Sequence, residues 1–230
     1  MVTAIYFAAA LLPAIILMRY IYQKDKAEPE PPALLAKLAL YGCGAAFLAS
    51  VIESGTDLVL ESMSFSSNTQ YVIILAITVG LAEEFAKMLF LKRATWDNHN
   101  FNYLFDGVVY AVFVSLGFAA LENVLYVFSY GLSVAFARAV LSVPAHMCFA
   151  VFMGAFYGQA KYCDVYGNKA GRTRNLLLAF ILPVIFHSFF DACAMSENDS
   201  AMGIFAIFVI VMYVIVYRMI RSGSLTDHEF

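Results

Sequence analysis

The stretch that decides the fold is VIILAITVGLAEEFAKMLFL, residues 72–91. A helix of this length, rising about 1.5 Å per residue, crosses the roughly 30 Å hydrocarbon core of a bilayer. Glu83 and Glu84 stand side by side near its middle, and Lys87 follows one turn later. A charge at the bilayer centre costs about 2.5–3.5 kcal/mol even on lenient insertion scales. The stretch therefore predicts a transmembrane helix whose polar residues serve a purpose other than packing.

The composition places the whole chain in the same class. Of 230 residues, 62% are hydrophobic and 13% are charged, which is typical of a polytopic membrane protein surrounded by lipid. We expect a single membrane domain over residues 1–230. The formal net charge of -3, without any block of basic residues, argues against a nucleic-acid partner.

The apolar runs predict about seven spans, and each of them should be helical. An open strand cannot satisfy its backbone hydrogen bonds in hydrocarbon, and no alternating pattern of a β-barrel runs through the chain. The fold class is therefore all-α, a polytopic bundle of transmembrane helices. The predicted spans are 2–22, 34–53, 71–91, 107–129, 134–160, 175–195 and 201–220.

The distribution of Lys and Arg predicts the orientation of these spans. Basic residues flank the first, third and fifth connections and the C-terminal end, whereas connections 54–70, 129–132 and 196–200 contain none. Since Lys and Arg near membrane spans are retained on the cytoplasmic side, the N-terminus should face out and the C-terminus in.

Polar residues of four predicted spans lie at a similar depth, near the bilayer midplane. They are Glu83 with Glu84, Glu122, His146 and His187. A single buried His is more often a satisfied hydrogen-bonding group than a ligand, and a Glu–Lys pair alone can be a structural ion pair. Five such residues at one depth are harder to explain structurally, and they predict a shared polar cavity.

Local spacing suggests how the groups of the third span act. Lys87 lies at i+4 from Glu83 and at i+3 from Glu84, so it can compensate one carboxylate while the other, about 100° round the helix, faces the cavity. The two acids should therefore have different roles.

The two histidines stand in helices that contain proline. His187 and Asp191 lie at i, i+4, the spacing at which a carboxylate can orient an imidazole or both residues can face one metal. Pro144 and Pro183 precede the histidines and interrupt the backbone hydrogen bonding there.

Two other charged residues have simpler interpretations. Arg138, near the outer end of the fifth span, is expected to extend its side chain toward the interface. Asp106 is expected to cap the fourth helix at its start.

Together these residues resemble the PrsW family of bacterial intramembrane proteases, itself similar to the CAAX prenyl endopeptidase and bacteriocin-processing superfamily. The resemblance covers residues 71–195, the expected catalytic core, and rests on these motifs: Glu83-Glu84-x-x-Lys87, Asp106-Gly107-x-x-Tyr110, Gly117-Phe118-Ala119-x-x-Glu122-Asn123, Pro144-x-His146 and His187-x-x-x-Asp191. The wider superfamily usually has Arg four residues after the Glu pair and His in place of Glu122, and PrsW-like proteins share both departures.

The resemblance implies an activity, a place and a substrate. It implies an intramembrane endopeptidase in the bacterial cell membrane, acting on a membrane-anchored protein. By this resemblance the substrate would be a single-pass anti-sigma factor, cut at site 1 during stress signalling.

The residues themselves are compatible with two kinds of hydrolytic chemistry. In one, Glu and His ligands hold Zn²⁺, which activates a bound water while a free Glu acts as general base. In the other, no metal is needed: a desolvated Glu activates water directly and His or Asn stabilises the oxyanion. The number of donors favours the zinc version.

Each site residue then receives an expected role. Glu83 is the base and Glu84, held by Lys87, points at the metal or the water; these two roles are interchangeable. The expected metal ligands are Glu84, Glu122, His146 and His187. Asn123 supports the oxyanion together with Glu122, and Asp191 orients His187.

Two non-proteolytic interpretations also fit membrane-embedded Glu and His. One is a proton- or ion-coupled transporter, in which these groups relay protons, and the other is a non-enzymatic membrane sensor or assembly factor. The adjacent Glu pair and the absence of internal sequence repeats favour the enzyme.

Overall fold

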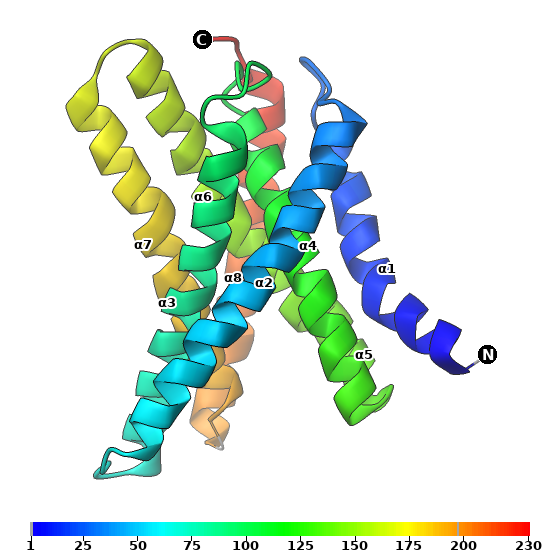
Figure 1. The fold of residues 1–230 in the computed structure, drawn as a ribbon, viewed down its shortest axis with the longest axis vertical. Coiled ribbons are helices and arrows are strands. Elements are labelled where there is room, and N and C mark those ends of the chain that lie inside the picture. Colours follow the sequence, from blue (N-terminus) through cyan, green and yellow to red (C-terminus); the bar gives the residue numbers. More distant parts are fainter. Residues whose placement is uncertain (1, 197) are drawn as a thin grey trace.

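The computed structural model of the protein describes residues 2–196 and 198–230, and within this part regular structure is helical (Figure 1). The elements are α1 (Val2–Tyr22), α2 (Pro32–Glu61), α3 (Asn68–Thr95), α4 (Asp106–Tyr130), α5 (Ser133–Ala137), the π-helical turn η1 (Arg138–Ser142), α6 (Val143–Val165), α7 (Lys169–Ala194) and α8 (Asp199–Thr226). Because α5, η1 and α6 follow one another without a break, the chain forms seven long rods in the described residues. The predicted all-α bundle is confirmed.

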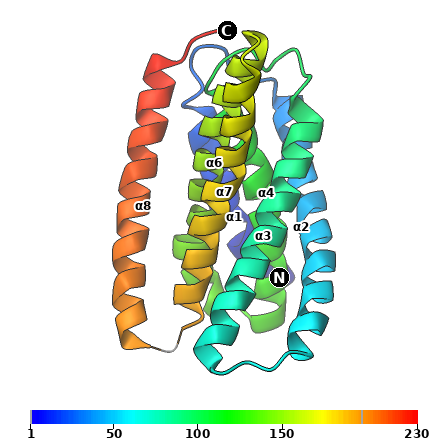
Figure 2. The same cartoon turned by 90° about the vertical axis from the view of Figure 1, so that its left-hand side faces the viewer.

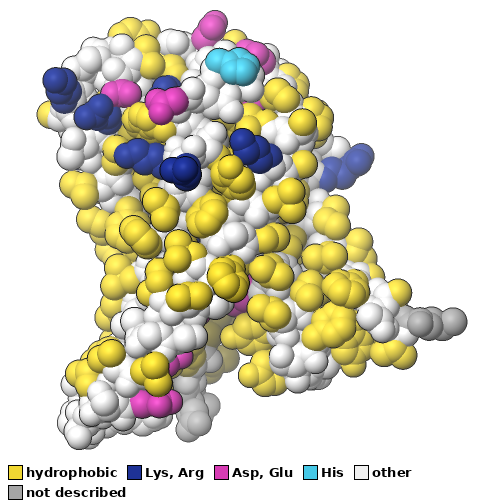
Figure 3. Space-filling model, in the orientation of Figure 1, with side chains coloured by type: hydrophobic (Ala, Val, Ile, Leu, Met, Phe, Trp, Pro, Cys, Tyr) yellow, Lys and Arg dark blue, Asp and Glu magenta, His cyan; other side chains and the backbone are white. Residues whose placement is uncertain are grey.

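Six of the rods are long and apolar enough to cross a membrane, within the part of the chain that the structure describes. The seventh, α3, differs by its charged residues, yet it packs among the others against α2, α4 and α7. Figure 2 shows the rods running side by side from one end of the molecule to the other. In Figure 3 apolar side chains cover the middle, and Lys and Arg gather at the end where the C-terminus lies.

Helix α4 forms the centre of the bundle, with α1, α2 and α6 packed around it. Every residue from Asp106 to Ala119 is buried. Glycines allow this packing: a Cβ on Gly117 would overlap the Ala39 carbonyl of α2, and one on Gly107 would lie 2.6 Å from the Gly154 carbonyl of α6. Small residues let helices pack backbone to backbone, so α4 fixes the positions of α2 and α6 relative to each other.

Two local predictions differ from the structure. Helix α2 continues to Glu61, beyond the expected end at residue 53, because the drop in hydropathy after residue 53 marks the edge of an apolar run and not the end of a helix. Asp106 does not cap α4: its Oδ2 accepts the amides of Asn102 and Tyr103, which precede the helix, and Phe105 occupies the N-cap position. The capping prediction is wrong.

Candidate active site

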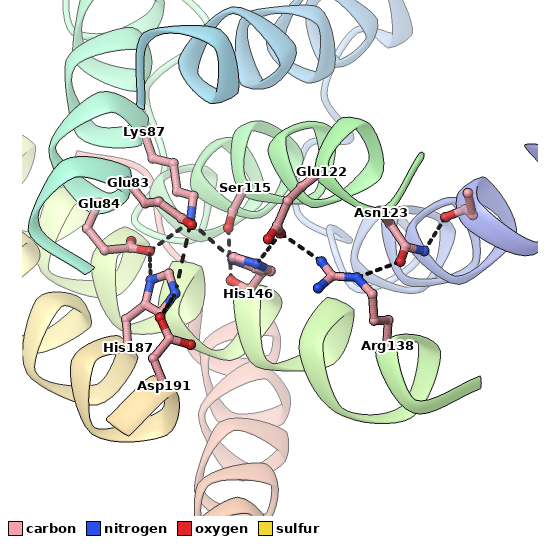
Figure 4. A network of polar contacts seen from close by, with 11 residues as sticks. Glu83, Glu84, Lys87, Ser115, Glu122, Asn123, Arg138, His146, His187 and Asp191 are labelled. Carbon is pink, nitrogen blue, oxygen red and sulfur yellow. Dashed lines mark hydrogen bonds and ion pairs between the residues drawn. The ribbon is translucent and has the colours of Figure 1, made fainter. Parts of the chain in front are cut away.

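The ammonium of Lys87 lies at the centre of a polar cluster formed by Glu83, Glu84, Lys87, His146 and His187, called here the Lys87 cluster (Figure 4). Its Nζ donates to Glu83 Oε2 and to Glu84 Oε1, each at 2.9 Å, and lies 3.1 Å from His146 Nδ1. Lys87 is 1% exposed, and the ring of Phe118 lies under Nζ at 4.0 Å. The cation therefore compensates both carboxylates, where the spacing predicted one.

The partners of Lys87 fix the tautomer of His146. An ammonium can only donate, so Nδ1 of His146 accepts, and Nε2 carries the ring hydrogen. This Nε2 lies 3.0 Å from Glu122 Oε2, to which it donates. Glu122 is therefore joined to the Lys87 cluster through the imidazole of His146.

His187 is held by acids on both sides of its ring. Its Nδ1 lies 2.9 Å from Glu84 Oε1, and its Nε2 lies 3.4 Å from Asp191 Oδ2 and 3.8 Å from Glu83 Oε2. Asp191 faces the imidazole from the same helix, as the i, i+4 spacing indicates. Helix α3 thus supplies the two glutamates and the lysine, and α7 supplies the imidazole that bridges them.

A glycine lets α3 and α7 come this close. A Cβ on Gly80, one turn before Glu84, would lie 2.6 Å from Ser188 Oγ and 3.1 Å from Ser188 N. Ser188 is the neighbour of His187, so any larger residue at position 80 would push His187 away from Glu84.

Arg138 joins the site from the other side, contrary to the expected extension toward the interface. Its Nη2 forms an ion pair with Glu122 Oε2 at 2.9 Å, and its Nε donates to Asn123 Oδ1 at 2.8 Å. Asn123 Nδ2 donates in turn to the Ala10 carbonyl of α1 at 2.7 Å. The snorkelling prediction is wrong, and Asn123 uses its polar atoms to hold Arg138 and α1.

The π-helical turn η1 that begins at Arg138 follows from Pro144. Proline has no N–H, so the carbonyl of Val140 has no helical donor. It accepts instead from Tyr213 Oη of α8 at 2.8 Å, while Val143 N–H donates five residues back to Arg138 O. The extra residue rotates the preceding side chains by about 100° about the helix axis, and Arg138 then faces Glu122.

A cavity of about 430 Å³ opens over these groups. Six of the charged or imidazole side chains that line it are Glu83, Glu122, Arg138, His146, His187 and Asp191. Glu84 is 0% exposed and lies behind its neighbour. The cavity is also lined by Glu53 of α2, a residue that the sequence analysis did not select, although its position at the end of a predicted span was a usable signal.

The donors of the Lys87 cluster fit a metal ion. Glu83, Glu84, His146 and His187 each offer one ligand atom, and these atoms all lie within 4.8 Å of one another. Glu84 Oε2 is buried without a hydrogen-bond partner in the described residues. The metal ligands predicted from the sequence include Glu122 in place of Glu83. In the structure Glu122 contacts the ring nitrogen of His146 that faces away from Lys87. Two carboxylates and two imidazoles are suitable ligands for zinc.

Fold and site together define a class: a membrane-embedded hydrolase whose active site is built from Glu and His. The profile described as PrsW family intramembrane metalloprotease matches residues 30–219. The chain is 34% identical to Protease PrsW of Clostridioides difficile (strain 630), over 96% of this chain and 90% of the relative. It is 33% identical to Protease PrsW of Bacillus subtilis (strain 168), over 80% of each. No solved structure matches significantly.

The chain therefore belongs to the PrsW family of intramembrane metalloproteases. It is a multi-pass protease of the bacterial plasma membrane. The transporter interpretation is not favoured by these relationships.

Proposed function

We propose that the protein hydrolyses a peptide bond of a membrane-anchored substrate with a water molecule that Glu83 activates. The observation that supports this is the unequal placement of the two adjacent glutamates. Glu83 lines the cavity, whereas Glu84 is fully buried between Lys87 and His187. One carboxylate can thus meet a water and a substrate, while the other holds the surrounding groups in place.

Residues on both sides of the cavity have parts in this proposal. Lys87 keeps the Glu83 side chain oriented, and Glu83 takes the proton of the attacking water. Arg138 is a cation at the cavity wall, on the side of Glu122, where the developing oxyanion can be stabilised. Glu83, which then holds that proton, can return it to the leaving amine, while His146 keeps its contact with Glu122.

Zinc fits the proposal as the resident metal. Glu84, His146 and His187 would hold it, which leaves Glu83 free to act as the base. A Zn²⁺ ion there would lower the pKa of a bound water to about 7. The donor set and the unpartnered Glu84 Oε2 support this assignment.

We also propose the class of substrate. Membership of the PrsW family and a site within the bundle favour a single-pass membrane protein, such as an anti-sigma factor. Its cleavage would then be the first step of a stress response.

Cleavage by reconstituted protein tests the proposal. The enzyme and a single-pass substrate are placed in the same liposomes, and products are followed by mass spectrometry. Glu83→Gln should lower the rate by about 10²–10⁴-fold, because an amide cannot take the proton of water. Glu61→Gln, an exposed glutamate at the end of α2, serves as the matched control and should cleave normally. Undiminished cleavage by Glu83→Gln would exclude Glu83 as the base.

Removal of metal tests the zinc assignment separately. Protein stripped with a strong chelator should lose cleavage and recover it on addition of Zn²⁺. Full activity after stripping would instead support the mechanism in which Glu and His act without a metal.

A further inference from the structure

A second group of carboxylates lies far from the active site. Asp25 and Glu30 belong to the α1–α2 connection, Asp106 begins α4, and Asp227 follows α8; these four residues are called here the acidic cluster. Ligand oxygens of Asp25, Asp106 and Asp227 all lie within 4.8 Å of one another. Along α4, Asp106 and Glu122 are separated by about 24 Å at 1.5 Å per residue. The acidic cluster is therefore a separate site, at the end of the bundle where the C-terminus lies (Figure 1).

These carboxyl groups are deeply buried without a cation. Asp25 is 4% exposed, Glu30 is 3% and Asp106 is 1%. One oxygen of each, Asp25 Oδ1, Glu30 Oε2 and Asp106 Oδ1, is buried with no hydrogen-bond partner among the residues that the structure describes. Within residues 2–196 and 198–230, no Lys, Arg or His forms an ion pair with any of the three. Buried carboxylates of this kind are normally paired or coordinate a metal.

The remaining oxygens hold the free ones in position. In the α1–α2 connection, Asp25 Oδ2 accepts the Glu30 amide at 2.9 Å, and Glu30 Oε1 accepts Tyr110 Oη at 2.7 Å. Each side chain is thus fixed through one oxygen and leaves the other without a donor.

Backbone amides also hold the carboxylates of the other two segments. Asp106 Oδ2 accepts the amides of Asn102 at 3.1 Å and Tyr103 at 2.7 Å, and Asp227 Oδ1 accepts the Phe105 amide at 2.9 Å. Backbone amides therefore orient carboxylates from separate parts of the chain toward one point. An arrangement with fixed oxygens and no nearby cation is a preformed site for a hard cation.

We propose that the acidic cluster binds a divalent cation of the Mg²⁺ and Ca²⁺ class through Asp25, Asp106 and Asp227, with Glu30 beside them. These ions prefer carboxylate oxygens, and the absence of His and Cys from the cluster argues against zinc or copper. The active-site metal, bound through His and Glu, is a different site, and this proposal does not depend on it.

The cation would fasten the C-terminal tail, residues 227–230. The tail already contacts the α3–α4 loop, since Tyr103 and Glu229 form a β-bridge and Phe230 N donates to Asn102 O at 3.0 Å. A cation shared by Asp227, Asp25 and Asp106 would tie this tail to the α1–α2 connection and to the start of α4.

Protons compete for the same oxygens. Burial raises the pKa of Asp25 to about 6 and the pKa of Glu30 to about 7. Binding should therefore strengthen as the pH rises and these carboxyl groups lose their protons, so it should be measured at about pH 8 and again at about pH 10.

Calorimetric titration of the purified full-length protein tests the proposal. Protein freed of metal by a chelator is titrated in detergent with CaCl₂ and separately with MgCl₂. The wild type should bind one of these ions in a saturable manner with a stoichiometry of about one. Asp25→Asn and Asp227→Asn should each weaken binding at least about tenfold, because each removes one charged ligand. The exposed Asp57→Asn, at the opposite end of the bundle, is the matched control and should bind like the wild type.

A further variant and a folding check separate the outcomes. His187→Ala disrupts the active site and should leave Ca²⁺ or Mg²⁺ binding unchanged. Folding of each variant is checked by size-exclusion chromatography. Asp227 is only half-buried, so Asp227→Asn should fold and can test the proposal even if Asp25→Asn elutes as aggregate. Absence of binding by the wild type at about 10 mM of either ion would overturn the proposal, as would binding that both Asn variants retain in full.

Discussion

At the level of single residues, Lys87 sets the geometry of the active site because its ammonium has three N–H groups and three partners. Two are the carboxylates of its own helix and the third is His146 of another helix. Sequence spacing predicts the first two contacts, since both acids lie within one turn. The third depends on how α6 packs against α3, which spacing along one helix does not reveal.

Removal of this cation should unfold or inactivate the protein. Lys87→Met leaves Glu83 and Glu84 buried without compensation, which should lower the free energy of unfolding by about 3–5 kcal/mol. Cleavage should fall at the same time because Glu83 loses its orientation. Denaturant titration in detergent and the liposome assay measure the two effects. Lys92→Met, exposed on the same helix, should change neither, and equal stability of the two variants would contradict the proposed role.

Arg138 and Glu53 show why part of the site could not be predicted from sequence. Arg138 lies 15 residues from its partner Asn123, and it faces inward only because of the π-helical turn before Pro144. Glu53 is the last residue of the expected span 34–53, and the packing of α2 places its side chain at the cavity wall. Charge alone marks such residues as interfacial; tertiary packing decides that they face the site.

At the level of helices, the expected spans agree with the seven rods within a few residues at most ends, because length and hydropathy are enough to define them. The larger differences occur where a helix leaves the apolar layer, as at Glu61 of α2. The change to π-helical geometry inside α5–η1–α6 is a finer feature. The sequence shows Pro144, but it does not show the Tyr213 hydroxyl that donates to the Val140 carbonyl at this turn.

The π-helical turn offers a prediction in which activity falls while stability changes little. Pro144→Ala supplies an N–H to the Val140 carbonyl, so this rod can become continuous α-helix. Arg138 would then turn away from Glu122, and cleavage should fall about 100-fold, the usual effect of a misplacement of about 1 Å. Melting temperature should change little, because the helix gains a hydrogen bond while Glu122 and Asn123 lose their contacts with Arg138. Pro13→Ala in α1 is the control; normal cleavage by Pro144→Ala would show that the turn does not matter.

The contact between α3 and α7 provides another test at this scale. Gly80→Val places side-chain atoms against Ser188, so the two helices must separate and Glu84 loses its contact with His187. We expect cleavage to drop tenfold or more and the free energy of unfolding to fall by about 1–3 kcal/mol, as in overpacked cores. Gly203→Val in α8, where a Cβ meets nothing within 4 Å, makes the same change without the clash. Equal rates for both variants would rule out the close approach as a requirement.

At the level of the whole molecule, basic residues gather at one end of the bundle, which supports the predicted orientation with the C-terminus in the cytoplasm (Figure 3). Single cysteines in a background without the native ones can test it. Ser62→Cys, exposed in the α2–α3 connection, should react with an impermeant maleimide in intact cells. Lys169→Cys, exposed at the start of α7, should react only after the membrane is opened. The reverse pattern would invert the topology.

The acidic cluster could not be predicted from the sequence. Its members come from positions 25, 30, 106 and 227, and no local pattern connects them. The sequence predicts a helix cap at Asp106 and places this residue in the Asp106-Gly107-x-x-Tyr110 motif, and neither feature indicates a cation site. Their meeting depends on the path of the C-terminal tail across the loops, which hydropathy and spacing do not determine.

The bond from Asn123 to the Ala10 carbonyl has a consequence for how this protein can change during evolution. Helix α1 is largely exposed, with Ala10, Ala14 and Ile21 its buried residues, and its link to the active-site network uses a backbone oxygen that every amino acid possesses. Lipid-facing residues of α1 can therefore be substituted during evolution without weakening this hydrogen bond. An alignment of relatives would show a variable helix there and give no sign that it is fastened to Arg138 through Asn123.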